Sequence, residues 1–128
     1  MNSPDIPARV MQFVTERIDS VPQLEALLLM WENPERLWTE DELAARIYVP
    51  KQVAAVILQS LQRQQLITAE VAPVRYRYNA QWDPPGEVLP EVAASYRRHL
   101  VPITTFIHSR ASSAVREFAR AFDFKKDR

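Results

Sequence analysis

The sequence predicts a mainly α-helical protein with one small β-hairpin and with additional helices at both ends. Three observations lead to this prediction. Apolar residues recur every three or four positions through most of the chain, which is the period of an amphipathic helix. The period shortens to two only after Leu66, where arginines and tyrosines alternate. The 128 residues, of which 47% are hydrophobic and 25% charged, are typical of one globular domain.

Two helices are predicted before residue 33. The apolar spacing from Ile6 to Ile18 indicates a short helix within an N-terminal extension over residues 1–20. Asp19 and Ser20 can cap a second helix, VPQLEALLLMWE, which has a proline in its first turn. The apolar face of this second helix is expected to comprise Leu24, Leu27, Leu28 and Trp31.

Two further helices are predicted around a tight turn. Thr39 and Glu42 have the spacing of a capping box and should start a helix that buries Leu43 and Ile47. Pro50 suits the first position of the next helix, because its missing N–H has no helical partner there. The buried face of that helix is expected to comprise Val53, Ile57, Leu58 and Leu61. A brief strand at Leu37 and Trp38 would give the later hairpin a third element to pair with.

A β-hairpin is predicted over residues 67–79. Its strands flank Val71-Ala72-Pro73, and alternation assigns Val74, Tyr76 and Tyr78 to one face and Arg75 and Arg77 to the other. The stretch QWDPPG, with the one glycine of the chain, then marks a boundary. We therefore expect a central domain over residues 21–80 and a C-terminal helical segment over residues 86–128.

The C-terminal segment carries an apolar stripe with alternating spacings of three and four residues. This pattern predicts a helix from about Glu87 to Arg110, with a kink or break at Pro102, and a last helix with Val115, Phe118, Ala119 and Phe122 inward. Such a stripe can pair with a second copy of the chain or lie on the domain. The first arrangement predicts a homodimer interface comprising Leu89, Val92, Tyr96, His99, Ile103 and Phe106.

No catalytic residue, metal site or cofactor is predicted. The chain has no cysteine, one glycine and two histidines, so thiol chemistry and a glycine-rich phosphate loop are excluded. His99 and His108 would lie half a turn out of phase on one straight helix and would not share a metal ion. The N-terminus lacks a basic start and an apolar run, and no stretch has the roughly 18 apolar residues of a membrane span, so we expect a cytoplasmic protein.

The charge distribution is uneven although the net charge is zero. Between Val21 and Pro50 there are six acidic residues and two arginines, whereas between Lys51 and Ala80 there are four basic residues and one glutamate. The sign therefore changes where the fourth helix begins. A protein with no net charge can still have one basic face.

The order of helix, capped helix, tight turn, helix and basic hairpin resembles the winged helix-turn-helix superfamily. LAARI, VAAVILQSL and QLI are similar to dimeric bacterial regulators of the multiple-antibiotic-resistance and phenolic-acid-regulator types. The resemblance covers about residues 21–79. It implies a helix at residues 50–64 that enters the major groove of duplex DNA, a hairpin that contacts the backbone, and terminal helices that form a homodimer. The turn and the wing tip lack the expected glycines.

The resemblance implies DNA contacts from Lys51, Gln52, Ala55, Gln59 and Arg63 on the helix and from Arg75 and Arg77 on the hairpin. Gln52 would pair with adenine, Lys51 would meet guanine or a phosphate, and Ala55 would touch a thymine methyl. The alternative is that these polar residues form only the solvated faces of their elements. The main hypothesis is a non-enzymatic transcriptional regulator that binds double-stranded DNA. The alternative hypothesis is a winged-helix module that binds a protein partner, and a ligand-responsive switch is compatible with both.

Overall fold

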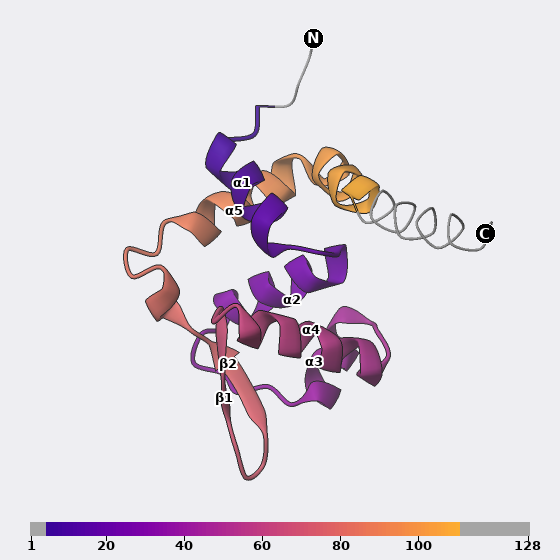
Figure 1. Cartoon of the computed structure of the whole chain (residues 1–128), viewed down its shortest axis with the longest axis vertical. Coiled ribbons are helices and arrows are strands. Elements are labelled where there is room, and N and C mark those ends of the chain that lie inside the picture. Colours follow the sequence, from indigo (N-terminus) through magenta and orange to yellow (C-terminus); the bar gives the residue numbers. More distant parts are fainter. Residues whose placement is uncertain (1–4, 111–128) are drawn as a thin grey trace, which may run out of the picture.

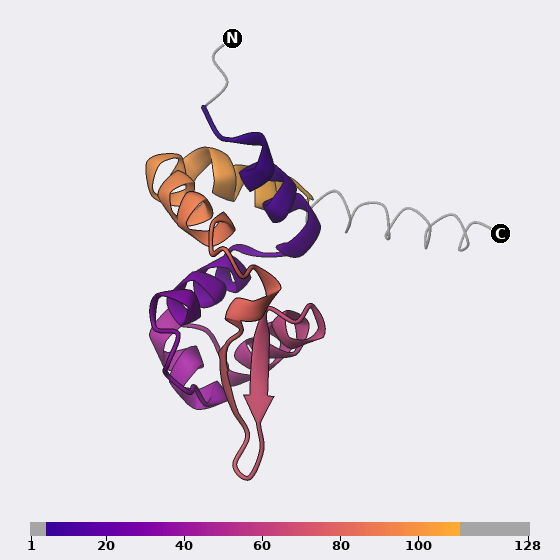
Figure 2. The same ribbon diagram turned by 90° about the vertical axis from the view of Figure 1, so that its left-hand side faces the viewer.

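The computed structural model describes residues 5–110, and all structural statements below refer to these residues. Terminal helices lie at one end of the molecule, three helices lie in the middle, and a hairpin protrudes at the other end (Figures 1 and 2). The elements in chain order are α1 (Ala8–Arg17), α2 (Val21–Glu32), α3 (Glu40–Ile47), α4 (Lys51–Arg63), β1 (Ile67–Glu70), β2 (Arg75–Tyr78), the short 3₁₀ helix η1 (Ala80–Trp82) and α5 (Val88–Arg98). A further helical segment follows at residues 100–110. The predicted last helix after residue 111 lies outside the described residues.

The predicted helix starts are confirmed by their caps. The Ser20 hydroxyl accepts a hydrogen bond from the Gln23 amide at 3.2 Å and begins α2. At α3 the Glu42 amide donates to the Thr39 hydroxyl at 3.1 Å, and the Thr39 amide donates to the Glu42 carboxylate at the same distance. These bonds satisfy amides that have no partner within the helix. Pro50 was predicted at the first helical position of α4. It is instead the N-cap, one position before the helix, and has an extended backbone.

The core surrounds α2, which contacts α3, α4, β2 and α5. This helix is buried on more sides than one apolar face, because Ala26 and Met30 are fully covered together with the predicted leucines. The prediction for α4 was wrong at Val53, which is 40% exposed. Ala54 is buried in its place, so the buried face of α4 is turned by one residue at its first turn.

The hairpin has the predicted strands, paired antiparallel with Glu70 opposite Arg75 and Ile67 opposite Tyr78. The predicted brief strand is reduced to one residue, since Trp38 and Tyr76 form an isolated bridge with hydrogen bonds of 2.7 and 2.8 Å. Tyr76 is buried by this bridge, and Tyr78 is half-buried. Val74 does not join them on the inward face, because it lies beyond β2 at the tip and is 49% exposed.

The C-terminal segment breaks earlier than Pro102. Helix α5 ends at Arg98, and its C-cap His99 has a non-helical backbone. Pro102 lies in the first turn of the next helical segment, where a proline is tolerated. The apolar stripe on these helices lies on the domain. Leu89, Val92 and Ile103 are buried in the same core as α1 and α2, so they do not form an exposed dimer interface in this structure.

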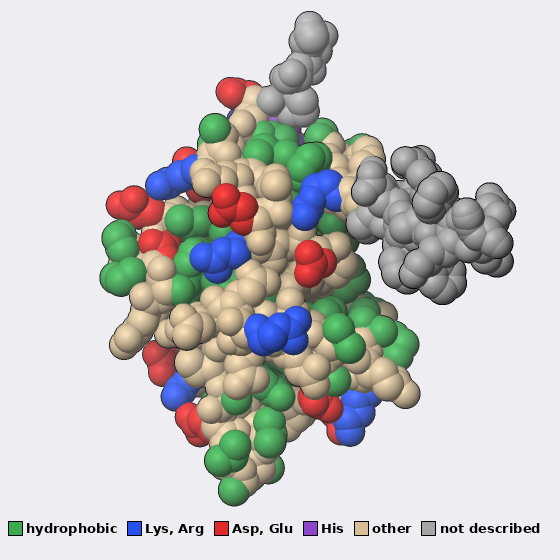
Figure 3. Space-filling model, viewed as in Figure 1, with side chains coloured by type: hydrophobic (Ala, Val, Ile, Leu, Met, Phe, Trp, Pro, Cys, Tyr) green, Lys and Arg blue, Asp and Glu red, His purple; other side chains and the backbone are tan. Residues whose placement is uncertain are grey.

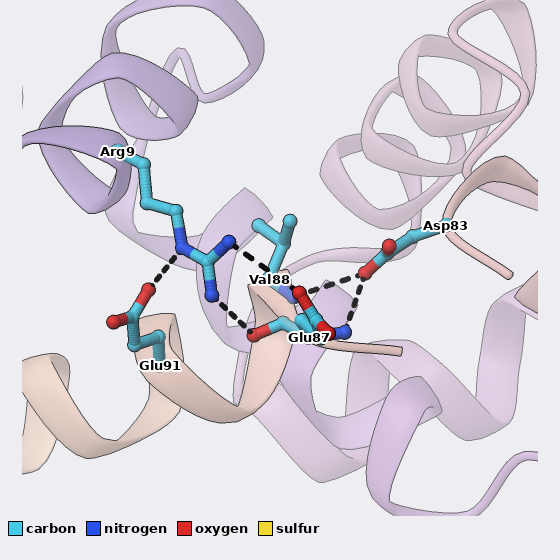
Figure 4. A network of polar contacts seen from close by, with 5 residues as sticks. All are labelled: Arg9, Asp83, Glu87, Val88 and Glu91. Atoms are coloured by element: carbon cyan, nitrogen blue, oxygen red, sulfur yellow. Dashed lines mark hydrogen bonds and ion pairs between the residues drawn. The ribbon is translucent and has the colours of Figure 1, made fainter. Parts of the chain in front are cut away.

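A polar network joins α1 to the start of α5 (Figure 4). The Arg9 guanidinium forms ion pairs with Glu91 and, at 3.7 Å, with Glu87. The Asp83 carboxylate accepts hydrogen bonds from the Glu87 and Val88 amides at 3.0 and 2.9 Å. Asp83 thus satisfies two amides at the beginning of α5, and its negative charge is favourable at that end of the helix dipole.

A second connection joins the segment at residues 100–110 to the other end of α1. The Arg110 guanidinium donates to the carbonyl oxygens of Val14 and Ile18 at 3.3 and 3.0 Å. These carbonyls lie at the C-terminal end of α1, where a positive charge is favoured. Both ends of α1 are therefore fixed to the C-terminal helices.

Candidate nucleic-acid interface

Helix α4 is held at its back by two glutamine side chains. The buried Gln23 amide of α2 donates to the Ser60 hydroxyl of α4 at 3.0 Å. Gln64, which follows α4, donates from its side chain to the Arg17 carbonyl oxygen of α1 at 3.0 Å. With buried apolar residues on the same side, these bonds fix the rotation of α4 about its axis. The opposite side of α4 therefore has a defined outward direction.

Four residues of α4 form its outward line: Gln52, Val56, Gln59 and Arg63. Their spacings of four, three and four residues place them on one side of the helix, opposite Ala54, Leu58 and Leu61. All four are exposed. The three polar members are predicted contact residues, whereas Val56, which is 64% exposed, was not predicted. Val56 could have been identified from the sequence, because it is an apolar residue at a position that does not belong to the buried face of the helix.

The remaining predicted residues of α4 lie at its flank. The Lys51 ammonium is 3.6 Å from an Asp41 carboxylate oxygen, in an exposed ion pair between α4 and α3. Ala55 is half-buried and presents only one methyl group. The turn before α4 holds Tyr48 in a left-handed conformation, with φ of 60°, and this side chain is 92% exposed. A tyrosine in that conformation is strained. Because the Tyr48 side chain is so exposed, its packing does not offset this strain.

The two hairpin arginines have different surroundings. The Arg77 guanidinium forms an ion pair with Glu70 on the neighbouring strand, at 2.9 Å. Arg75 is half-buried, and its Nε atom is buried without a hydrogen-bond partner among the described residues. Both arginines thus lie on the hairpin, as predicted, but the positive charge of Arg77 is already balanced by the Glu70 carboxylate.

The surface around the hairpin is mixed in charge. In the view of Figure 3, Lys and Arg side chains are scattered among acidic and apolar ones and form no continuous patch. The hairpin tip is hydrophobic in this view, and Val71 there is 77% exposed. Such a surface predicts weaker electrostatic attraction to a polyanion than a continuous basic stripe would give.

The hollows on the surface of residues 5–110 are open to solvent. One, lined by Gln65, Ile67, Thr68, Asn79, Gln81 and Trp82, has a volume of about 340 Å³, and another, over Gln59, Gln62 and Arg63 of α4, has about 350 Å³. Both volumes are at the lower end of the range for small-molecule pockets, roughly 300 to 1,000 Å³. No group of three or more histidine, aspartate or glutamate side chains is arranged to hold a metal ion in this part of the chain, and no helix there is long and apolar enough to cross a membrane.

No family model and no curated protein matches the sequence, but solved structures match its architecture. A MarR family transcription regulator is 21% identical, aligns over 94% of this chain and 80% of its own, and has a TM-score of 0.52. ZitR of Lactococcus lactis in complex with DNA is 18% identical over 91% of this chain and 90% of its own, at a TM-score of 0.50. The fold is a winged helix-turn-helix.

A third solved structure with a similar architecture is the heme sensor protein PefR in complex with heme and carbon monoxide. It is 12% identical, covers 88% of this chain and 84% of its own, and has a TM-score of 0.51. The predicted mainly helical fold class, a winged helix-turn-helix with added terminal helices, is thereby confirmed. In this fold α3 and α4 form the helix-turn-helix, and the hairpin of β1 and β2 is the wing. The second helix of the motif, here α4, is called the recognition helix because it reads the bases where such a motif binds DNA.

Proposed function

We propose that this protein is a non-enzymatic transcriptional regulator that binds double-stranded DNA in the cytoplasm. The recognition helix enters the major groove with Gln52, Gln59 and Arg63, and the wing places Arg75 and Arg77 at the backbone. The observation that carries this proposal is the outward line of α4, a row of exposed side chains on a helix whose rotation is fixed from behind. The likeness of the fold to a DNA-bound ZitR structure supports it.

The ion pairs on this surface are compatible with DNA binding. The pairs of Lys51 with Asp41 and of Arg77 with Glu70 join partly exposed side chains. Exposed pairs of this kind contribute about 0 to 1 kcal/mol, so a phosphate can replace either carboxylate at small cost. The two carboxylates remain nearby, however, and reduce the effective positive charge of the interface. We therefore expect a shallower salt dependence than the number of basic residues suggests.

We further propose that the protein binds DNA as a homodimer through the segment after Gly86. Exposed apolar side chains, rather than the buried stripe, support this arrangement. Leu100 and Val101 are exposed at the start of the segment at residues 100–110, and exposed apolar neighbours of this kind favour a partner surface. Tyr96 and Phe106 of the predicted interface are half-buried. A dimer would present two recognition helices to half-sites about one DNA turn apart.

The test is titration of the protein into random-sequence duplex DNA at several salt concentrations. The affinity of the wild type should fall with salt, less steeply than the number of basic residues alone would give. The double variant Arg75→Ala, Arg77→Ala should bind all sequences more weakly, with a log–log slope that is smaller by up to about 1.8, or about 0.9 for each lost phosphate contact. Arg97→Ala with Arg98→Ala, on α5, is the matched control for the loss of two charges.

Oligomeric state is measured in the same samples by sedimentation equilibrium. Replacing Leu100 and Val101 with glutamate should yield monomers, and it should weaken DNA binding because one half-site contact is lost. A wild-type monomer would refute the dimer. An unchanged salt slope in the wing double variant would refute the wing contacts.

A protein partner is the second candidate for this surface. The hydrophobic wing tip, where Val71 and Val74 are exposed, favours it, because contiguous apolar side chains on a protruding loop are typical of protein contacts. The same titration separates the two functions. Absence of binding to random duplex even at low salt would retire the DNA hypothesis and favour the protein partner.

A further inference from the structure

The centre of the outward line of α4 is hydrophobic. Val56 lies between Gln52 and Gln59 on this line and is 64% exposed. Its neighbours Ile57 and Leu58 face the core, so a polar residue at position 56 would not disturb packing. An exposed valine contributes little to folding and has a lower intrinsic helix propensity than alanine. The fold alone therefore gives no reason for valine at this position.

The side chains beside Val56 match the chemistry of A·T base pairs. In the major groove, a glutamine amide can pair bidentately with N6 and N7 of adenine, and an apolar side chain can contact the C5-methyl group of thymine. Guanine is commonly read by arginine or lysine. Arg63 is the only basic member of the outward line, and it lies in the last turn of α4. The bases are usually read by the first turns of a recognition helix.

Lys51 does not supply a guanine contact in the same direction. It lies about a quarter turn or more from the outward line at 100° per residue, and its ammonium is 3.6 Å from Asp41. Before Arg63, the outward line of α4 thus presents the side-chain amides of Gln52 and Gln59 and the branched apolar side chain of Val56.

We propose that α4 reads an A·T-rich half-site and that Val56 selects thymine by contacting its C5-methyl group. This inference rests on the proposed DNA-binding function and adds a sequence preference to it. Val56 replaces the predicted thymine contact of Ala55, whose single methyl group is half-buried at the flank of the helix. The contact buries the valine methyls and the thymine methyl together, which is the source of the preference.

The test uses three duplexes of equal length: alternating A·T, the same sequence with uracil in place of thymine, and alternating G·C. Uracil lacks only the C5-methyl group, so the first two duplexes isolate the proposed contact. The wild type should bind the thymine duplex about fourfold more tightly than the uracil duplex for each methyl contacted, which corresponds to about 0.8 kcal/mol per buried carbon. It should bind the G·C duplex most weakly.

Two variants complete the experiment. Val56→Ala should lose most of the difference between thymine and uracil while keeping the salt dependence, since no charge changes. Val53→Ala removes an exposed valine from the flank of the same helix and should keep the difference. Equal wild-type affinity for thymine and uracil, or a difference that survives in Val56→Ala, would overturn the inference but leave the proposed function intact. Failure to bind any of the three duplexes at low salt would overturn both.

Discussion

Removing the Glu70 carboxylate from the wing should strengthen DNA binding. In the free protein the Arg77 guanidinium is 2.9 Å from this carboxylate, and both side chains are partly exposed. Glu70→Gln keeps the size of the side chain and removes its charge, so Arg77 becomes fully available to a phosphate. Loss of the pair itself should cost about 0 to 1 kcal/mol of folding free energy, because exposed ion pairs are weak.

The magnitude follows from counterion release. One additional effective phosphate contact makes the slope of log affinity against log salt more negative by about 0.9. Between 50 and 200 mM salt the affinity of Glu70→Gln should therefore fall about 3.5-fold more than that of the wild type. Fluorescence anisotropy with a labelled random-sequence duplex measures both slopes.

Glu16→Gln is the matched control for net charge. Glu16 is exposed on α1, and α1 lies at the opposite end of the molecule from the wing (Figure 1). If Glu70→Gln steepens the slope no more than Glu16→Gln does, the effect comes from overall charge. The assignment of Arg77 to a phosphate would then be refuted.

Further predictions concern stability. Thr39→Ala removes the hydroxyl of the capping box and should lower the free energy of unfolding by about 1 kcal/mol, measured by urea denaturation, while Thr68→Ala on the exposed strand should change it little. Leu58→Ala opens a cavity at a fully buried position and should cost about 2 to 5 kcal/mol in the same assay. Burial, followed by the hydrogen bond to Glu25, raises the pKa of Tyr96 to about 12. Because this folded-state pKa exceeds the unfolded value of about 10, the stabilisation is present below about pH 10 and is lost as pH rises through 12, a loss that Tyr96→Phe should reduce.

The local features of the fold were predictable because their causes are local. The capping box at Thr39 and the cap at Ser20 depend on residues within four positions of each other, and both were confirmed. The alternation along β2 was confirmed at Tyr76 and Tyr78 but not at Val74, which lies at the exposed tip. The brief strand predicted at Leu37 and Trp38 was confirmed only in part, because the structure has a single-residue bridge of Trp38 to Tyr76 at that edge of the hairpin.

The errors arose where contacts between distant elements decide the outcome. Val53 follows the apolar period, but among residues 5–110 it is left 40% exposed at the first turn of α4. The sequence pattern of the apolar stripe around Val92 fits two arrangements equally well, pairing with a second copy of the chain or packing on the domain. The position of α1 shows that the chain itself covers this stripe. The pairing of Arg77 with Glu70 crosses the hairpin diagonally, so it depends on a strand register that composition does not give.

The hydrogen bond of the Gln64 side chain to the Arg17 carbonyl connects the end of α4 to the end of α1. Gln64 directly follows α4 and Arg17 is the last residue of α1, so a displacement of α1 that keeps this bond carries the end of α4 with it. A molecule that binds α1 or α5 and displaces α1 in this way would change the affinity of α4 for a molecule bound there. By thermodynamic linkage, the molecule on α4 would change the affinity for the molecule on α1 or α5 by the same factor.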